Sequence, residues 1–147
     1  MADPQAVAIL KDLTAFTEDV VKAIAIEVTA NLQEATPVAT GFARASWIPS
    51  LGSPSSGTGG LPESPNPAEA AAGIARIAAY KLTDGKVFVT NNASYIQQLA
   101  RGSSSEAPAG FDRVAIERGM RDATAALSTS STRGLRARVV SSFAGGG

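Results

Sequence analysis

The chain has 147 residues, the size of a single domain, and it contains no cysteine and no histidine. Their absence excludes disulfides, thiolate and imidazole metal sites, cysteine nucleophiles and histidine-based catalytic triads. The 13 basic and 13 acidic residues cancel, which argues against a strongly cationic nucleic-acid binder. An alanine-rich, electrically balanced chain with so few reactive side chains is more typical of a structural component than of a catalyst.

Nothing in the sequence indicates export or membrane insertion. Residues 1–10 lack the basic and long apolar regions of a signal peptide, and no stretch approaches the roughly 20 apolar residues of a membrane helix. We therefore expect a soluble protein in the cytoplasm of the cell that makes it, with no membrane partner.

A long helix is predicted at the N-terminal end. Asp3 followed by Pro4 is a typical helix start, and Pro37 requires the helix to end near Ala35. Apolar residues recur between them at spacings of three and four: Ile9, Leu13, Phe16, Val20, Ile24, Val28 and Leu32. Such a helix is about 48 Å long, more than the width of a small domain, so we expect part of it to pack on a neighbouring molecule.

A strand, a loop and a second helix are predicted next. Residues 42–48 are expected to form a short strand, although their apolar alternation is imperfect. Residues 50–67 are rich in Ser, Gly and Pro, and we expect a flexible loop there. The second helix is expected to open at residues 67–69 and to run through residues 70–80. Its apolar face is expected to hold Ile74, Ile77 and Ala78.

The last elements follow at short intervals. A turn at Asp84-Gly85 precedes a β-branched strand over residues 86–90, and a short helix over residues 95–101 is expected to end at Gly102. A third helix is predicted over residues 109–127. The fold class is therefore α+β, with a long N-terminal helix and further helices packed on a small, mainly antiparallel β-sheet. Residues 1–127 are expected to form this domain, and residues 128–147 a basic C-terminal arm. Within the arm, a low-complexity hinge is expected to precede a strand-like segment.

Charge is distributed unevenly along the chain. Residues 1–40 hold two lysines and six acids, whereas residues 128–147 hold three arginines and no acid. An acidic start and a basic finish suit a ring in which the arm of each subunit meets the helix of the next. The alternative, that both ends are simply solvated, is left open.

No constellation of residues indicates catalysis. The serines lie in no nucleophile elbow, and the lysines show no placement that suggests a Ser–Lys dyad. Glu18 with Asp19, and Asp112 with Glu117, are expected on exposed helix faces, where carboxylates are usually solvated. The glycine-rich residues 57–60 lack the Lys-Ser/Thr that a phosphate loop needs. We expect no enzyme, no cofactor and no metal site.

For two aromatic residues and for a group of three arginines, the sequence leaves a structural role and a binding role open. Trp47 is expected to anchor the core or an interface, because it is large. Tyr95 is interpreted as an aromatic anchor for the short helix, with ligand contact as the alternative. Arg133, Arg136 and Arg138 could contact passing nucleic acid or pair with an acidic neighbour.

Two segments resemble a known family. The sequence Ala-Thr-Pro-Val-Ala-Thr-Gly-Phe-Ala-Arg-Ala-Ser-Trp over residues 35–47 resembles the "TPVDTG…ARASW" segment of phage tail-completion, or head–tail joining, proteins (neck, minor tail protein Z-like). Residues 89–99, with Gly102-Ser103 and residues 107–111, resemble the "TNNxPYxxxLExGxSxQAPxGM" signature of that family. The order of predicted elements also agrees, so the resemblance covers about residues 5–127.

Each matching piece has a local structural interpretation. Thr40-Gly41 permits a tight turn from the helix into the strand that carries Trp47. Asn91 and Asn92 can close the next strand by bonding their own backbone and by tolerating left-handed geometry. The remaining interpretations concern the short helix and its exit. Tyr95 and Leu99 share one helical face, Gly102 caps the helix, and Pro108 keeps the chain extended until Gly110 releases it into the third helix.

Three departures from the family pattern concern polar residues. The family's Asp in the first segment is Ala39 here, its acid after the Leu is Ala100, and its basic residue near the end of the second segment is replaced over residues 104–106. If those polar residues make contacts between subunits in the family, other residues must supply these contacts in this chain.

The resemblance implies a structural virion protein of a tailed phage. It implies a homo-oligomeric ring at the head–tail junction, expected to be a hexamer, which lies in the virion neck or at the top of the tail after assembly in the host cytoplasm. Two roles stay open for this ring: a neck or tail-completion protein on the connector side, and a tail terminator. The implied partners are other copies of the chain, the head connector or stopper and the tail tube, with DNA only as transient contents of the lumen. Candidate interface residues are Arg44, Arg133, Arg136, Arg138 and Phe143. The alternative is a non-viral oligomeric scaffold or binding module built on a helical dimer.

Overall fold

A computed structural model describes residues 3–39 and 41–128 of the chain. Thr40 and the C-terminal arm from residue 129 onward, with Arg133, Arg136, Arg138 and Phe143, lie outside the described residues. The helices are α1 (Pro4–Ala35), α2 (Phe42–Ala45), α3 (Ala68–Ala78), η1 (Leu82–Asp84), α4 (Ile96–Ala100) and α5 (Phe111–Ser128). The strands are β1 (Trp47–Leu51), β2 (Gly60–Leu61), β3 (Ser64–Pro65) and β4 (Val87–Asn91).

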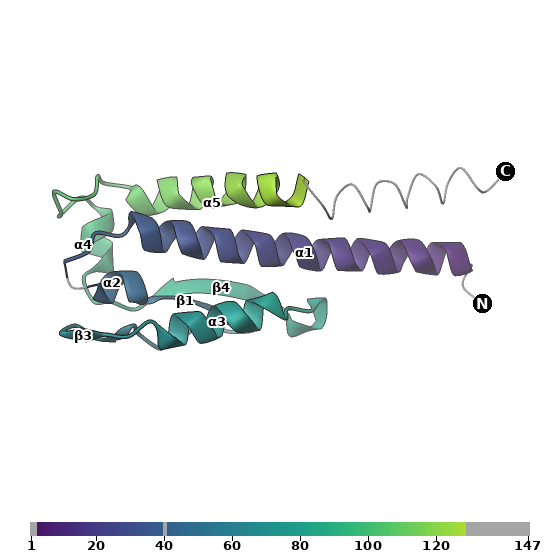
Figure 1. Cartoon of the computed structure of the whole chain (residues 1–147), viewed down its shortest axis with the longest axis horizontal. Coiled ribbons are helices and arrows are strands. Elements are labelled where there is room, and N and C mark those ends of the chain that lie inside the picture. The colour runs from purple at the N-terminus through teal and green to yellow at the C-terminus, as the bar shows by residue number, and fades with distance from the viewer. Residues whose placement is uncertain (1–2, 40, 129–147) are drawn as a thin grey trace.

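Helix α1 has the bounds that the sequence predicts. The Asp3 carboxylate accepts a hydrogen bond of 3.0 Å from the Gln5 amide and so caps the first turn. Thr36, which precedes Pro37, has an extended backbone at φ −73° and ψ 128°, and the helix ends there. The Thr36 hydroxyl donates back to the Leu32 carbonyl over 2.6 Å. These caps set a helix of 32 residues that runs along most of the length of the described molecule (Figure 1).

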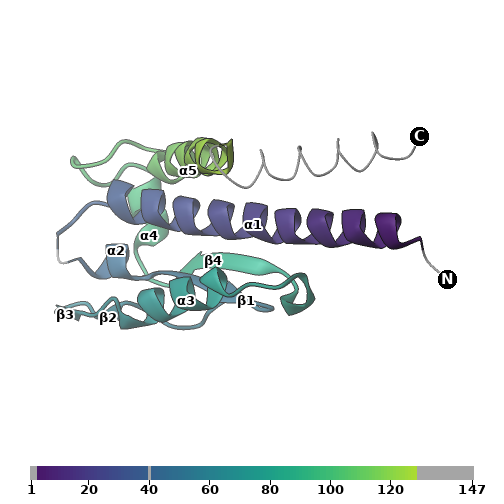
Figure 2. The same cartoon turned by 45° about the vertical axis from the view of Figure 1, so that its right-hand side comes forward.

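The elements stack in layers around α1. Helix α5 lies antiparallel along one side of α1, and the β1–β4 sheet lies on the other, with α3 packed against β1 (Figures 1 and 2). The two strands are antiparallel and pair Trp47 with Asn91 at one end and Leu51 with Val87 at the other. This arrangement confirms the predicted α+β class, with a long N-terminal helix packed on a C-terminal helix and a small antiparallel sheet.

Two clusters of buried side chains form the core. The first joins α1 to α5 through Val28, Leu32 and Ala115, with Trp47 and Val89 packed against it from the sheet. The second joins the segment after α1 to the segment after β4. Its buried members are Phe42, Ala43 and Ala93, and Tyr95, Ile96 and Leu99 pack against them. The long helix is therefore fixed to the sheet at its C-terminal half.

The prediction of a strand over residues 42–48 is wrong for its first half. Gly41 has a φ of +84° and leads directly into the helical turn α2, in which the Ser46 hydroxyl donates to the Phe42 carbonyl over 2.7 Å. Phe42, Ala43 and Ala45 are all buried, which the alternating side chains of a strand against one layer cannot achieve. Burial of successive apolar residues thus outweighs their β-propensity, and the strand begins only at Trp47.

The predicted loop over residues 50–67 contains more regular structure than expected. Strand β1 continues into it as far as Leu51, and β2 and β3 form a minimal antiparallel ladder that pairs Gly60 with Pro65. The amide of Gly59 donates to the Ser46 hydroxyl over 2.9 Å. That residues 50–67 are flexible stays a prediction.

The apolar face predicted for the second helix is confirmed for Ile77, which is buried, and is wrong for Ala78, while Ile74 is half-buried. Ala70, Gly73 and Ile77 are buried on α3, whereas Ala78 is exposed, because a residue one position along a helix points about 100° away. Small residues are needed on this face, since a Cβ on Gly73 would overlap the carbonyl oxygen of Pro49 on β1. The packing distance between α3 and β1 therefore selects the face.

Candidate functional site

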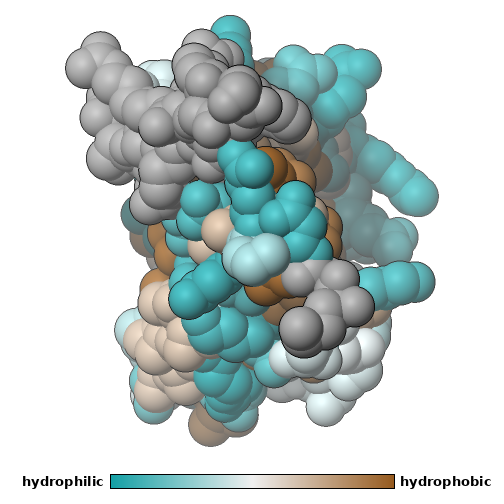
Figure 3. All heavy atoms as spheres, turned by 90° about the vertical axis from the view of Figure 1, so that its right-hand side faces the viewer, coloured by the Kyte–Doolittle hydropathy of each residue, from teal (hydrophilic) through white to brown (hydrophobic). Residues whose placement is uncertain are grey.

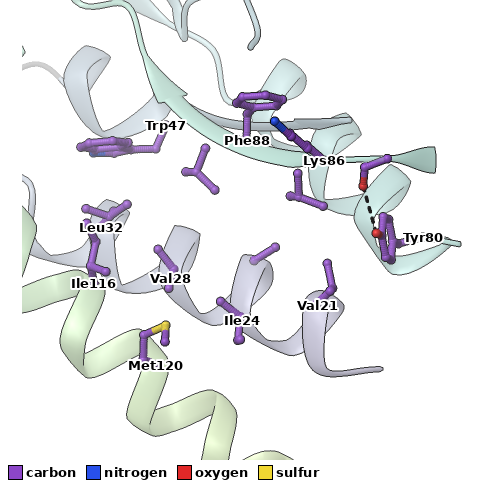
Figure 4. A pocket seen from close by; sticks show the side chains of 14 residues that line it. Val21, Ile24, Val28, Leu32, Trp47, Tyr80, Lys86, Phe88, Ile116 and Met120 are labelled. Atoms are coloured by element: carbon purple, nitrogen blue, oxygen red, sulfur yellow. Dashed lines mark hydrogen bonds between the residues drawn. The ribbon is translucent and has the colours of Figure 1, made fainter. Parts of the chain in front are cut away.

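An apolar groove runs along α1 between β4 and α5. Its volume is about 600 Å³. Side chains from four elements meet there (Figure 4): α1 contributes Val21, Ile24 and Val28, β1 contributes Trp47, β4 contributes Val87 and Val89, and α5 contributes Ile116 and Met120. Ile116 is 43% exposed and Met120 46% exposed, although both are large and apolar. A groove of this kind is a surface that a partner can fill.

The edge of β4 beside this groove is open. The Gly52 amide donates to the Lys86 carbonyl over 2.8 Å. In an antiparallel ladder, hydrogen-bonded and non-hydrogen-bonded residue pairs alternate from such a pair onward. Val87 and Val89 belong to non-hydrogen-bonded pairs, so their N–H and C=O groups point away from β1. Among residues 3–39 and 41–128 nothing bonds these backbone groups. A free row of donors and acceptors is a template for another strand.

The opposite edge of the sheet is closed. Pro49 occupies an outward-facing position of β1 and has no N–H to donate. The backbone of α3 at Gly73 lies against the outward Pro49 carbonyl. The sheet can therefore be extended at β4 only.

Trp47 connects this groove to the core, and its predicted role as a core or interface anchor is consistent with that position. Its indole packs beside Val28 and Leu32, and its Nε1 donates to the Thr36 hydroxyl over 2.8 Å. The side chain is only half-buried and lines the groove. The hydrogen bond fixes the indole at the mouth of the surface that a partner would cover.

The two asparagines after β4 fasten the surrounding loops. The Asn91 amide donates to the Ala43 carbonyl over 2.8 Å and its Oδ1 accepts from the Ala93 amide, so Asn91 does bond its own local backbone as predicted. Asn92 donates to the Ser55 and Gly57 carbonyls over 2.8 and 2.9 Å. The left-handed geometry predicted for them is wrong, since every described residue with positive φ is a glycine. Their side chains, rather than unusual backbone angles, close the strand.

Helix α4 is held as the sequence predicts. The rings of Tyr95 and Phe42 lie 6.3 Å apart, and Leu99 packs on the same cluster. Gly102 has a φ of +93°, and its amide donates to the Leu99 carbonyl while the Ser103 amide donates to the Gln98 carbonyl. These two bonds form a Schellman motif, the usual glycine-terminated helix end.

The exit towards α5 is a turn rather than an extended segment. The Pro108 carbonyl accepts from the Phe111 amide over 3.2 Å, and Gly110 adopts a φ of +78°. The predicted extension is therefore wrong, because burial of both Ala107 and Phe111 requires the chain to bend between them.

The two segments singled out in the sequence meet in space. A hollow of about 290 Å³ is lined by Ala39, Gly41 and Ala43 from the first segment and by Tyr95, Leu99 and residues 103–106 from the second. Two of the three departures described in the sequence analysis, Ala39 and residues 104–106, line this hollow, whereas Ala100 does not. The segments are thus two halves of one structural unit.

No family model, no curated protein and no solved structure matches this chain.

Arg44 makes contacts inside the chain. Its Nη2 donates to the Glu34 and Thr36 carbonyls over 3.3 and 3.2 Å, at the C-terminal end of α1. A guanidinium there satisfies carbonyls that the helix leaves unbonded and complements the helix dipole. Its role in an interface between subunits stays a prediction.

Of the four carboxylates predicted on exposed helix faces, Glu117 is exposed, Asp19 and Asp112 are half-buried, and Glu18 is buried, so the prediction is wrong for Glu18. Glu18 is 8% exposed rather than solvated, because its Oε1 accepts from the Leu82 amide over 3.2 Å and its Oε2 lies 3.5 Å from the Lys81 ammonium. This contact fastens η1 to α1. Over the part of the chain that is described, no group of acidic side chains could hold a metal ion, and no helix is long and apolar enough to cross a membrane.

Sequence reasoning missed the groove itself. The pattern of the third helix does not single out Ile116 and Met120, and the free edge of β4 has no counterpart in a one-dimensional pattern. The available signal was Pro49, because a proline inside a strand marks an edge and so leaves the other edge for pairing.

Proposed function

We propose that this protein is a structural virion component of a tailed phage that forms a ring at the head–tail junction. It would join the head connector to the tail tube and leave a passage for DNA. Both motif segments line the same hollow, and this supports the proposal. The two segments that resemble the family therefore belong to one packed unit of the structure. The order of elements agrees with the one that the resemblance implies.

The observation that carries the self-assembly part of the proposal is the open β4 edge above an apolar groove. A two-stranded sheet is marginal alone and gains from a third strand or a packed partner. The groove already exposes Ile116 and Met120, whose burial would stabilise a contact by about 1.5 kcal/mol or more for each side chain. A neighbouring copy is the partner that the proposal assigns to this surface.

Ring closure needs two different surfaces on each subunit. In a cyclic assembly the contact is heterologous, so the groove of one subunit receives another part of the next. Six copies are expected, as the resemblance implies. A net charge of zero suits a lining past which DNA must slide without being held. The role is one of assembly and has no catalytic step.

Oligomeric state in solution is the first test. We expect the purified protein to form a closed ring, seen by light scattering and negative-stain electron microscopy, alone or with tail tubes. Ile116→Glu and Met120→Glu should abolish the ring, because each places a charge in the apolar contact, while circular dichroism of the variants stays unchanged. Val114→Glu is the matched control, since Val114 is 45% exposed on the same helix but does not line the groove.

A phage lacking the gene is the second test. Filled heads and tails should accumulate unjoined, and the wild-type gene but not the Met120→Glu variant should restore joined particles. A stable monomer or dimer that never forms rings with tail tubes would contradict the proposal and favour a scaffold built on a helical dimer.

A further inference from the structure

The N-terminal half of α1 has an uncovered apolar face. Helix α5 covers only the C-terminal half of α1 and ends at Ser128, about midway along it (Figures 1 and 2). Beyond that point Val7, Leu10 and Leu13 are 49%, 63% and 44% exposed. In the view from this end of the molecule, brown apolar side chains are visible between hydrophilic ones (Figure 3).

This uncovered face continues the one on which α5 packs. A Cβ on Gly119 of α5 would lie 2.6 Å from the Cα of Val28, so Val28 marks the contact line. From Val28 the positions three or four residues apart lead back through Ile24, Val20, Thr17, Leu13 and Leu10. Residues at these spacings share one side of a helix. The contact surface for α5 therefore extends past the end of α5.

We propose that residues 129–147 of the same chain cover this face. They follow directly on Ser128, whose helix runs antiparallel to α1 and so directs the chain towards the uncovered half. The uncovered stretch, residues 4–19, is about 24 Å long, and the 19 residues that follow Ser128 reach about 28 Å even as a helix. The length of the arm matches the length of the exposed surface.

The chemistry of the two segments is complementary. Residues 3–20 carry four carboxylates and one lysine, whereas residues 129–147 carry three arginines and no acid. The arm also supplies apolar side chains for the exposed face, at Leu135, Val139, Val140 and Phe143. Opposite charges around an apolar contact favour this pairing over association of two acidic helices.

Tethering selects the same chain over a second copy. A segment joined by a few residues to its binding site has an effective concentration in the millimolar range, above that of any free copy in a dilute solution. The proposal does not depend on the proposed function, because it concerns the isolated subunit.

Amide hydrogen exchange tests the proposal. In the full chain we expect slow exchange over residues 9–17, and in a variant that ends at Ser128 we expect these amides to exchange at least about tenfold faster, while residues 24–35 stay unchanged. Equal exchange over residues 9–17 in both proteins would overturn the proposal. Loss of protection that depends on protein concentration would identify a second copy as the occupant and would overturn it as well.

A full-length pair of variants separates docking from a general effect of truncation. Phe143→Asp should accelerate exchange over residues 9–17, because it places a carboxylate against an acidic, apolar face. Ser142→Asp adds the same charge one residue away without removing an apolar side chain, and a smaller effect is expected. Equal effects would show that charge alone accounts for the change and would contradict a docked apolar contact. None of these outcomes requires ring formation, so failure here is distinct from failure of the proposed function.

Discussion

Gly119 brings the backbones of α1 and α5 together. In a helix Gly→Ala normally stabilises by about 1 kcal/mol, because glycine is a poor helix former. Here the added Cβ would lie 2.6 Å from the Val28 Cα and 2.8 Å from the Val28 nitrogen, and backbone atoms cannot move aside cheaply.

We therefore expect Gly119→Ala to lower the free energy of unfolding by about 1–3 kcal/mol in urea denaturation. The neighbouring exposed change Arg118→Ala serves as the control and should be nearly neutral. A stabilised Gly119→Ala protein would mean that the two helices are further apart than described.

The two asparagines after β4 allow a matched comparison. Asn91→Ala removes bonds to the Ala43 carbonyl and from the Ala93 amide, both part-buried, and should cost about 1–3 kcal/mol of unfolding free energy. Asn92→Ala removes two bonds of similar length at an exposed position, where water can replace them, so its loss should stay below about 1 kcal/mol. Thermal or urea unfolding measures both, and equal losses would contradict the assignment of Asn91 as the structural one.

Several single residues were predictable because their signals are local. Asp3 caps α1, Gly102 ends α4 and Tyr95 anchors α4, and each effect is decided by neighbours within a few positions. Glu18 was not predictable, since its partners Lys81 and Leu82 are more than 60 positions away.

At the scale of elements, α1 depends on its buried C-terminal half. Leu32 is 2% exposed and lies where α1 meets both α5 and the sheet. We expect Leu32→Ala to lower the free energy of unfolding by about 2–5 kcal/mol, measured by circular dichroism in urea. Leu61→Ala removes the same atoms from a side chain that is 59% exposed, and it should change stability by less than about 0.5 kcal/mol.

The helices were more predictable than the strands. The periodicity of α1 extends over 32 residues and leaves little ambiguity, whereas residues 42–48 are too few to separate a strand from a helical turn. The choice between them came from long-range packing: Gly59 lies against Ala45, and Asn91 bonds Ala43. Neither contact is visible from the sequence near residue 42.

At the scale of the whole molecule, the proposed contact is apolar although the charge is unevenly distributed. The groove contains one charged residue, Lys86, among its lining side chains. We therefore expect ring formation to change little between about 0.05 and 0.5 M salt, because screening acts on charges and not on apolar burial. Light scattering across this range checks the expectation. Dissociation at high salt would instead favour rings held by the basic arm on the acidic helix of the next subunit.

The sequence predicts the fold class of the layered arrangement, but not how its layers are placed against one another. Composition and element order led to an α+β fold, but the position of α5 on α1, and hence the groove, depends on which faces meet. Gly119 and Gly73 decide those faces, because each permits a close approach to a neighbouring element. A glycine inside a helix does not by itself indicate which element will pack against it.

Trp47 is the single tryptophan of the chain, and it stands at the mouth of the groove. Its fluorescence spectrum is therefore a built-in optical probe that needs no attached dye. Because the indole is half-buried, covering the groove should shift its emission to shorter wavelength and shield it from acrylamide quenching. A stopped-flow trace of this signal would time the arrival of a partner at the groove in the unmodified protein.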